Sequence, residues 1–268
     1  TIAIIPFMSC AGRLPLFVLL CGAFFPKGAA LALLGIYLFG VLLAILSALL
    51  FGKFVKEDDL PFVMELPPYR IPTGKAIWRH TWEKGRQYLQ KMATTILVAS
   101  VVIWFLGYFP RTQTLQQVSP DAVSILEADM PSSQLERSYL AQIGKAVEPA
   151  MRPMGFDWRL DVGLLTGIVA KELVVSSLGV MYLQDNPEAV GADNEKNTAL
   201  QAALARSMTF PTAIAYMIFV LLYFPCIATF VAIKNETGKW GWAVAICAYT
   251  IAVAWLFSFL GYHIALFF

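Results

Sequence analysis

Long hydrophobic runs separated by polar stretches dominate the pattern along this chain. A membrane-spanning helix needs roughly 20 consecutive, mostly apolar residues. Residues 28–51 and 241–268 meet that requirement without any Asp, Glu, Lys or Arg. Residues 92–109 form a shorter uncharged run, and residues 210–233 form a span that Pro225 interrupts. The pattern therefore predicts an all-α, polytopic helical membrane protein.

Two further apolar stretches are irregular. Residues 1–25 contain two prolines, and residues 162–182 have Lys171 and Glu172 at their centre. A proline inside a membrane helix removes one N–H and leaves a carbonyl without its partner, which lipid cannot replace. We therefore expect both stretches, together with the 210–233 span, to be broken or re-entrant helices whose exposed backbone faces protein or a wet cavity.

The distribution of charge predicts the orientation in the membrane. Residues 52–91 contain eight basic residues, whereas residues 110–160 contain five basic and six acidic ones. The positive-inside rule places the first loop in the cytoplasm and the second outside. For residues 162–182, a full crossing and a re-entrant hairpin are both open. We favour re-entry because it keeps the acidic residues 185–195 outside.

Two loop segments show helical periodicity. In residues 75–90, Trp78 and Trp82 share one face with a basic rim beside it, which is typical of a helix lying in the membrane interface. A plain helical extension of the next span is the alternative. Apolar residues at four-residue spacing predict a second, short amphipathic helix over residues 135–147, which Pro149 and Pro153 would end.

Composition supports the membrane class and excludes several others. Of the 268 residues, 58% are hydrophobic, whereas a soluble domain usually has about 45–50%. The net charge of +2 and the lack of a dense basic tract give no reason to expect a nucleic-acid partner. The sequence contains no phosphate-binding loop and no hydrolase or metalloprotease motif, so we do not expect this chain to be an enzyme. Because it opens inside an apolar segment without Met, we expect it to be the C-terminal part of a longer protein.

The proline breaks near the two ends of the chain each contain a thiol. Cys10 follows the first break, with Ser9 beside it, and Cys226 follows Pro225, with Thr229 one helical turn further on. Thiols, hydroxyls and freed carbonyls together suit a borderline divalent transition metal. The alternative is that each cysteine is a small buried hydrophobic residue, which is our expectation for the two cysteines in unbroken runs.

Lys171 and Glu172 are candidates for function because ionisable groups are expensive inside a membrane. Insertion scales give a cost of about 2.5–3.5 kcal/mol for Lys or Asp at the centre of a helix. We include Glu172 among the candidate metal ligands. The structural alternative is that the two residues cap a short half-helix or pair with Arg13, and the role of Lys171 stays open.

Six strings spread over nearly the whole chain resemble the membrane domain of the bacterial ferrous-iron transporter B family. They occur in the family's order, at residues 6–10, 13–15, 62–70, 167–172, 224–229 and 236–238. The family usually has Gly-Ala after the first cysteine, where this chain has Ala11-Gly12. Both residues are small, so the exchange changes little.

The resemblance implies a multi-pass protein of the bacterial inner membrane that imports Fe²⁺. Its gate segments would form the ion pathway, with Cys10 and Cys226 as pathway ligands. It also implies a cytoplasmic G domain, N-terminal to this chain, that binds GTP and Mg²⁺. The expected partners are that domain, the missing membrane helices, lipid, and small cytoplasmic proteins of the same uptake system.

Two other functions compete with iron transport. A transporter of another substrate, such as a nucleoside, could share broken helices of this kind. Its site should present Asn, Gln and Glu side chains at the breaks, whereas the thiols found there favour a metal. A structural or signalling membrane domain would leave Lys171 and Glu172 inside an apolar segment without explanation.

Overall fold

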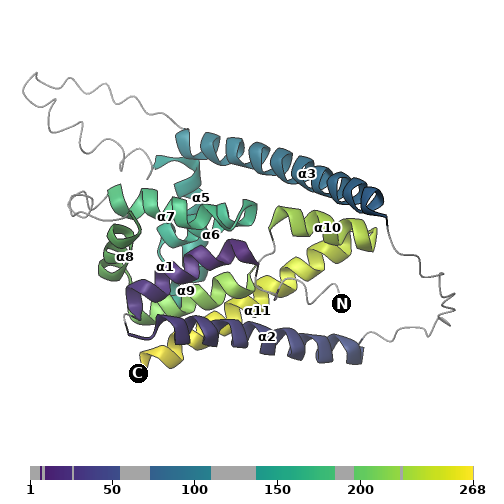
Figure 1. Ribbon diagram of the computed structural model, residues 1–268. Coiled ribbons are helices and arrows are strands. Elements are labelled where there is room, and N and C mark those ends of the chain that lie inside the picture. Colours follow the sequence, from purple (N-terminus) through teal and green to yellow (C-terminus); the bar gives the residue numbers. More distant parts are fainter. Residues whose placement is uncertain are drawn as a thin grey trace, which may run out of the picture.

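The protein is an assembly of helices (Figure 1). The computed structural model describes residues 7, 10–25, 27–54, 73–109, 137–184, 196–223 and 226–267. Every regular element within these ranges is helical, and two helices, or three if a bent pair counts as one span, are long and apolar enough to cross a membrane. The prediction of an all-α membrane protein is confirmed. The predicted loop residues 55–72, 110–136 and 185–195 lie outside the described ranges.

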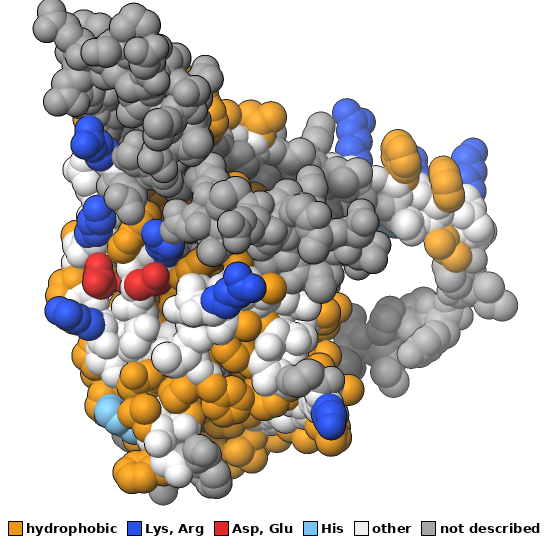
Figure 2. All heavy atoms as spheres, turned by 90° about the vertical axis from the view of Figure 1, so that its left-hand side faces the viewer, with side chains coloured by type: hydrophobic (Ala, Val, Ile, Leu, Met, Phe, Trp, Pro, Cys, Tyr) orange, Lys and Arg blue, Asp and Glu red, His pale blue; other side chains and the backbone are white. Residues whose placement is uncertain are grey.

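The two long apolar helices lie where continuous hydrophobic runs predict them. They are α2 (Ala29–Phe54) and α11 (Trp240–Leu266). On α2 large apolar side chains point outward, and Leu31 and Leu49 are more than 70% exposed. An exposed apolar surface of this extent suits lipid rather than water. The side view in Figure 2 shows mostly apolar side chains over the lower part of the described surface and most of the charged ones above them.

Helix α3 (Gly74–Tyr108) is continuous over 35 residues. It joins the predicted interface helix 75–90 and the predicted span 92–109, so the alternative of a helical extension is the correct one. The residues between the two segments are good helix formers without proline, so nothing in the local sequence ends the helix there. Trp78 and Trp82 stack on each other at 6.5 Å on its exposed surface.

Helix α5 (Tyr139–Met151) corresponds to the second predicted amphipathic helix. The hydroxyl of Ser138 caps it by accepting a hydrogen bond from the Ala141 N–H at 3.2 Å. Of the two prolines predicted to end this helix, Pro149 lies inside its last turn, whereas Pro153 lies in the 3₁₀ turn that follows Met151. The chain turns away only after a short 3₁₀ turn, at Gly155, whose φ of 74° favours glycine.

The stretch predicted to be broken around residue 171 consists of two helices, α6 (Trp158–Val169) and α7 (Leu173–Gln184). Asp157 begins α6 by accepting a hydrogen bond from the Leu160 N–H at 3.0 Å. Ala170 ends α6 with an extended backbone, at φ −148° and ψ 127°. Each helix has 12 residues, about 18 Å at 1.5 Å per residue, which is too short to cross a bilayer alone.

Hydrogen bonds between α6 and α7 make this pair an antiparallel hairpin. The Tyr182 hydroxyl, near the end of α7, donates to the Asp157 carboxylate at 3.3 Å. Halfway along the pair, the Ser177 hydroxyl donates to Thr166 at 3.0 Å. Helix α7 therefore runs back alongside α6, and the Lys171–Glu172 pair lies at the apex between them.

The last broken stretch consists of α9 (Phe210–Leu222) and α10 (Ile227–Thr237). Pro225 lies outside the described residues, but Tyr223 and Cys226 on either side of it are described and non-helical. Before α9, helix α8 (Lys196–Ser207) meets it at a bend of 113°. At the N-terminal end, a 3₁₀ turn leads directly into α1 (Leu14–Phe24).

Helix α9 forms the centre of the molecule. It packs along α11. The Ser258 hydroxyl of α11 donates to the Ala215 carbonyl. Helices α1 and α2 pack against α9 as well, and Figure 1 shows α1 beside α9 and α2 below them. This arrangement brings the interrupted segments together in the interior.

Candidate functional site

The first break is the turn that precedes α1. The Arg13 N–H donates to the Cys10 carbonyl at 3.2 Å and so closes the 3₁₀ turn. Pro15 lies in the first turn of α1, where its missing N–H removes no helical hydrogen bond. Cys10 is exposed, whereas the Arg13 side chain is 2% exposed. The turn therefore directs a guanidinium group into the interior next to a thiol-bearing loop.

The second break is the apex of the α6–α7 hairpin, and its two charged residues differ in environment. Lys171 is buried, and its Nζ lies 4.6 Å from the centroid of the Tyr223 ring, a cation–π contact. Glu172 is exposed and lies against Gly12, where an added Cβ would be 3.3 Å from Oε1. The apex thus contacts both of the other breaks.

The third break follows α9. The Tyr223 hydroxyl donates to the Leu164 carbonyl at 3.4 Å, which ties this break to the hairpin. The approach depends on Gly167, because any Cβ there would collide with the Tyr223 hydroxyl. Cys226 is half-buried, and its Sγ is 3.3 Å from Oγ1 of Thr229.

The three breaks form one polar group, which we call the break cluster: Cys10, Arg13, Lys171, Glu172, Tyr223, Cys226 and Thr229. The thiols Cys10 and Cys226 each lie within electrostatic range of both Arg13 and Lys171. Two thiols that are far apart in the sequence thus lie near the same two buried basic side chains. Any positive charge on these side chains repels a metal cation, so anionic ligands must offset it for an ion to bind here.

The predicted metal ligands are brought near one another only in part. Cys10, Cys226, Glu172 and Thr229 lie in or beside the break cluster, whereas Ser9 lies outside the described residues. Among the residues that the structure describes, no group of three or more His, Cys, Asp or Glu side chains is placed to hold a metal ion. The ligand set therefore stays a prediction.

The two remaining cysteines are buried in the apolar core. Cys21 is 1% exposed and its Sγ lies 3.9 Å from Sδ of Met217. Cys247 is 4% exposed on α11. Their environments are those of small hydrophobic residues, which provides matched controls for the two thiols at the breaks.

Sequence reasoning missed three polar side chains that the fold buries near the hairpin. It treated Arg13 only as a possible partner of other charges, and it assigned no role to Asp161 or Tyr223. All three are at most 3% exposed. The sequence did contain a signal for the two charged residues, Arg13 and Asp161. Both lie beside apolar stretches, where an ionisable group is costly and therefore a candidate for function.

Two family descriptions match the chain. "Nucleoside recognition", the Gate family, matches residues 89–240, which is more than half of the chain. "Ferrous iron transport protein B C terminus" matches residues 33–84. The two matches do not overlap, since one ends at residue 84 and the other begins at residue 89, both within α3, and together they cover most of the helices described above.

Curated relatives match the whole chain. A Porphyromonas gingivalis protein, the Fe(2+) transport protein A/Fe(2+) transporter FeoB fusion protein, is 45% identical and covers 100% of this chain. The Fe(2+) transporter FeoB proteins of Campylobacter jejuni and Helicobacter pylori are 36% and 32% identical and cover 99% and 98% of it. The chain spans only 34%, 41% and 43% of these three relatives, respectively. No solved structure matches the chain.

Proposed function

The chain belongs to the ferrous iron transport protein B family, as a C-terminal part of its membrane region, and from this we propose that it is the permease part of an Fe²⁺ importer of the bacterial inner membrane. The observation that supports this most is the convergence of the three breaks. It brings Cys10 and Cys226 to the same pair of buried cations. Broken helices that meet in the interior are the usual setting of a transporter's substrate site.

The chemistry of the break cluster favours a borderline divalent metal. Thiolates are soft ligands, and Mg²⁺ or Ca²⁺ would prefer a site made of carboxylates. Cys10, Cys226 and Glu172 supply up to three negative charges once metal binding releases the thiol protons. These charges offset the two positive charges of Arg13 and Lys171. Fe²⁺ would then enter a site whose total charge stays small.

A nucleoside is the less favoured substrate. The description of the Gate family names nucleoside recognition, but residues 10–13, 170–172 and 223–226 include no Asn or Gln. Neutral amides at these positions would be needed to pair with the edge of a base. Two thiols and two buried cations serve a metal ion with anionic ligands better.

The hairpin geometry supports re-entry from the outer side of the membrane. Asp157 and Tyr182, at the two ends of the α6–α7 hairpin, are hydrogen-bonded to each other, so both ends lie on one side. With the basic residues before α3 in the cytoplasm, that side is the outer one. A cysteine introduced at position 188 should react with a membrane-impermeant maleimide from outside. Labelling from the cytoplasmic side alone would contradict re-entry.

The remaining parts of the transporter lie beyond this chain. The resemblance assigns GTP and Mg²⁺ to a G domain N-terminal to it, and we assign no catalytic role to these residues. In the Porphyromonas gingivalis relative, Fe(2+) transport protein A is fused to the transporter. This supports a small protein of that kind as a partner of the full-length protein that contains this chain.

The function is tested by Fe²⁺ uptake into liposomes that contain the full-length protein under reducing conditions. The double variant Cys10→Ser/Cys226→Ser should lower the initial rate by roughly tenfold, a loss of about 1.4 kcal/mol in transition-state stabilisation. Serine keeps the size but is a harder, weaker ligand. The control Cys21→Ala/Cys247→Ala removes two buried thiols and should change uptake little. If the two double variants had the same initial rate of uptake, the thiols at the breaks would contribute only to packing and not to metal binding.

A further inference from the structure

Asp161 is a buried acidic side chain that the helix carrying it does not need. It lies in the first turn of α6, but the cap of that helix is Asp157. The side chain is 0% exposed, and neither carboxyl oxygen has a hydrogen-bond partner among the described residues. Its surroundings therefore decide whether it carries a charge.

Among the described residues, no group around this side chain is placed to stabilise an ionised carboxylate. The cavity that it borders is lined by apolar groups of α5, α6, α9 and α11. The tyrosine hydroxyls on the α9 side already have acceptors. Tyr216 donates to the Leu160 carbonyl at 3.5 Å, and Tyr223 donates to the Leu164 carbonyl at 3.4 Å.

The neighbouring charges disfavour ionisation as well. Asp157 on α6 and Glu148 on α5 are the charged groups within electrostatic range of Asp161 in the described part of the chain, and both are acidic. Tyr182 of α7 donates its hydroxyl to Asp157, and Ile251 faces the cavity from α11. Nearby like charges and the loss of hydration both favour the neutral form of a carboxylic acid.

The start of a helix favours the charged form, but this effect is too weak to decide. The first turn of a helix favours a negative charge by a factor of about two to five. Burial disfavours the ionised form of a fully enclosed carboxyl group by about a thousandfold or more. The balance therefore favours the neutral acid, which has a proton bound.

The packing of α6 depends on that proton. Helix α6 lies so close to α5 that a Cβ added at Gly144 would be 2.9 Å from the Trp158 carbonyl. An ionised Asp161 would need water as a hydrogen-bond partner, and water can reach it only if α6 moves away from its neighbours. The hairpin is therefore stable in this position with Asp161 neutral, and ionisation requires the hairpin to move.

We propose that Asp161 is a proton-binding site of the transport cycle, occupied while the hairpin is packed and emptied when the hairpin moves and admits water. Ionisable residues inside membrane transporters serve as proton relays as well as ion sites. In this exchange the carboxylic acid gives its proton to water, and no other bond changes. The inference rests on the proposed iron transport, because the apex of the same hairpin belongs to the break cluster. Its consequence is that Fe²⁺ uptake is coupled to the binding and release of a proton.

The first test detects the proton in the full-length protein in detergent. At about pH 7 an exposed aspartate is ionised, so the carbonyl stretch of a protonated carboxylic acid marks an unusual group in the infrared spectrum. This band should lose intensity in Asp161→Asn. It should stay unchanged in Glu83→Gln, which removes an exposed carboxylate on α3. Identical bands in the wild type and Asp161→Asn would overturn the inference.

The second test measures initial rates of Fe²⁺ uptake into liposomes under reducing conditions, between about pH 5.5 and about pH 8. The wild-type rate should change at least about fivefold over this range, whereas Asp161→Asn, which is neutral at every pH, should vary less than about twofold. Glu148→Gln removes a neighbouring negative charge and keeps Asp161. Its profile should keep the wild-type amplitude and move to lower pH, because Asp161 then ionises more easily. Glu83→Gln should follow the wild type.

The outcomes separate the proton from the transport. A profile of Asp161→Asn that parallels the wild type would overturn the coupling. If Asp161→Asn does not fold, Glu148→Gln decides, because a profile that stays in place or moves to higher pH would contradict a proton on Asp161. If the wild-type protein takes up no Fe²⁺, the proposed function fails, while the infrared measurement still tests the proton.

Discussion

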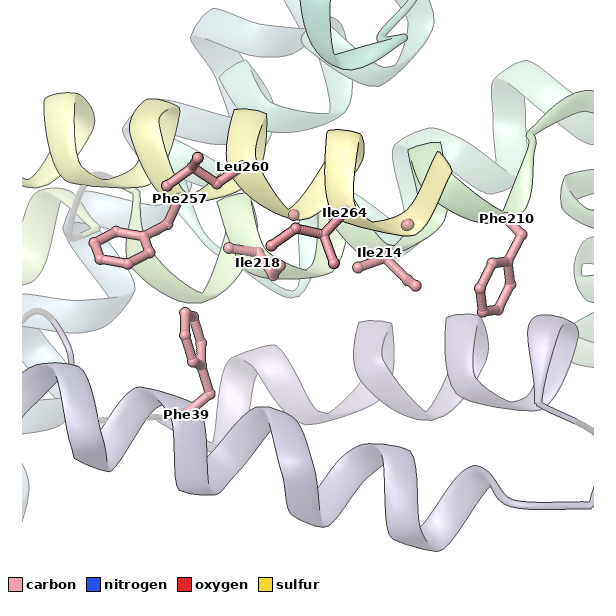
Figure 3. A pocket seen from close by; sticks show the side chains of 9 residues that line it. Phe39, Phe210, Ile214, Ile218, Phe257, Leu260 and Ile264 are labelled. Carbon is pink, nitrogen blue, oxygen red and sulfur yellow. The ribbon is translucent and has the colours of Figure 1, made fainter. Parts of the chain in front are cut away.

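Two cavities in the same helical assembly differ in what they offer a ligand. The larger, of about 640 Å³, lies between α2, α9 and α11 and is lined only by apolar groups, among them Phe39, Ile218 and Phe257 (Figure 3). The smaller, of about 100 Å³, is bordered by Asp161 and by Tyr223, whose ring contacts Lys171 at the break cluster. It therefore differs from the larger cavity in its place beside the hairpin as well as in its volume.

Residues of α9 and its C-cap residue line both cavities. Ile214 and Ile218 of α9 face the larger cavity, and Phe219 and Tyr223 face the smaller one. Each pair is four residues apart, which places its members on one helical face. The sequence of α9 thus separates a lipid-like surface from the side that contacts the hairpin. Substitutions on the side of the larger cavity should mainly lower the free energy of unfolding. Substitutions on the side of the hairpin should lower Fe²⁺ uptake.

The strongest effect is expected where the hairpin meets Tyr223. In Gly167→Ala the new Cβ collides with the Tyr223 hydroxyl and lies 2.6 Å from Cγ2 of Val174. Overpacking of this kind costs about 1–3 kcal/mol, and separating Tyr223 from the hairpin should also abolish uptake. Thermal unfolding in detergent and Fe²⁺ uptake measure the two effects. The matched variant Gly179→Ala meets only Leu200, at 3.7 Å, and should behave as wild type.

A smaller effect, confined to transport, is expected at the apex of the hairpin. Lys171→Met keeps a long side chain on the Tyr223 ring, where sulfur packs well, but removes the buried charge whose Nζ has no hydrogen-bond partner in the described structure. Uptake should fall about tenfold, or about 1.4 kcal/mol, because fewer anionic ligands are held at the cluster. The melting temperature should not fall.

Lys171→Arg provides the control for that variant, because it keeps a positive charge near the same ring. It should retain more uptake than Lys171→Met. A rise in uptake on removing the charge would show that Lys171 repels the ion rather than organising its ligands. If uptake and melting temperature fell together, Lys171 would instead be a residue that stabilises the fold.

The smallest effect on transport is expected in the larger cavity. Ile218→Ala removes a half-buried side chain whose Cδ1 lies against Gly261. Loss of packing should lower the free energy of unfolding by about 2 kcal/mol, while uptake per folded molecule changes less than twofold. A large loss of uptake in folded Ile218→Ala protein would show that the apolar cavity takes part in transport.

The sequence by itself determined which segments are helical and where they break. Unbroken apolar runs predicted residues 28–51 and 241–268, and the structure has α2 and α11 there. Helix breaks fall at the Lys171–Glu172 pair and beside Pro225, as predicted. These features depend on local chemistry: a missing N–H, a charge in an apolar run, and hydrophobic length. For residues 75–109 the local sequence left two possibilities open, a separate interface helix and an extension of the next span, and the structure has one continuous helix, α3.

Only the tertiary structure decided which breaks meet and which charges are buried. The contact of Lys171 with Tyr223, the packing of Glu172 against Gly12 and the enclosure of Asp161 all join segments distant in the sequence. Adjacent in the chain, Lys171 turns inward and Glu172 outward, so their roles cannot be read from their shared position. Such contacts depend on how helices approach one another, which small residues such as Gly167 permit. That approach is a property of the packed assembly rather than of any one segment.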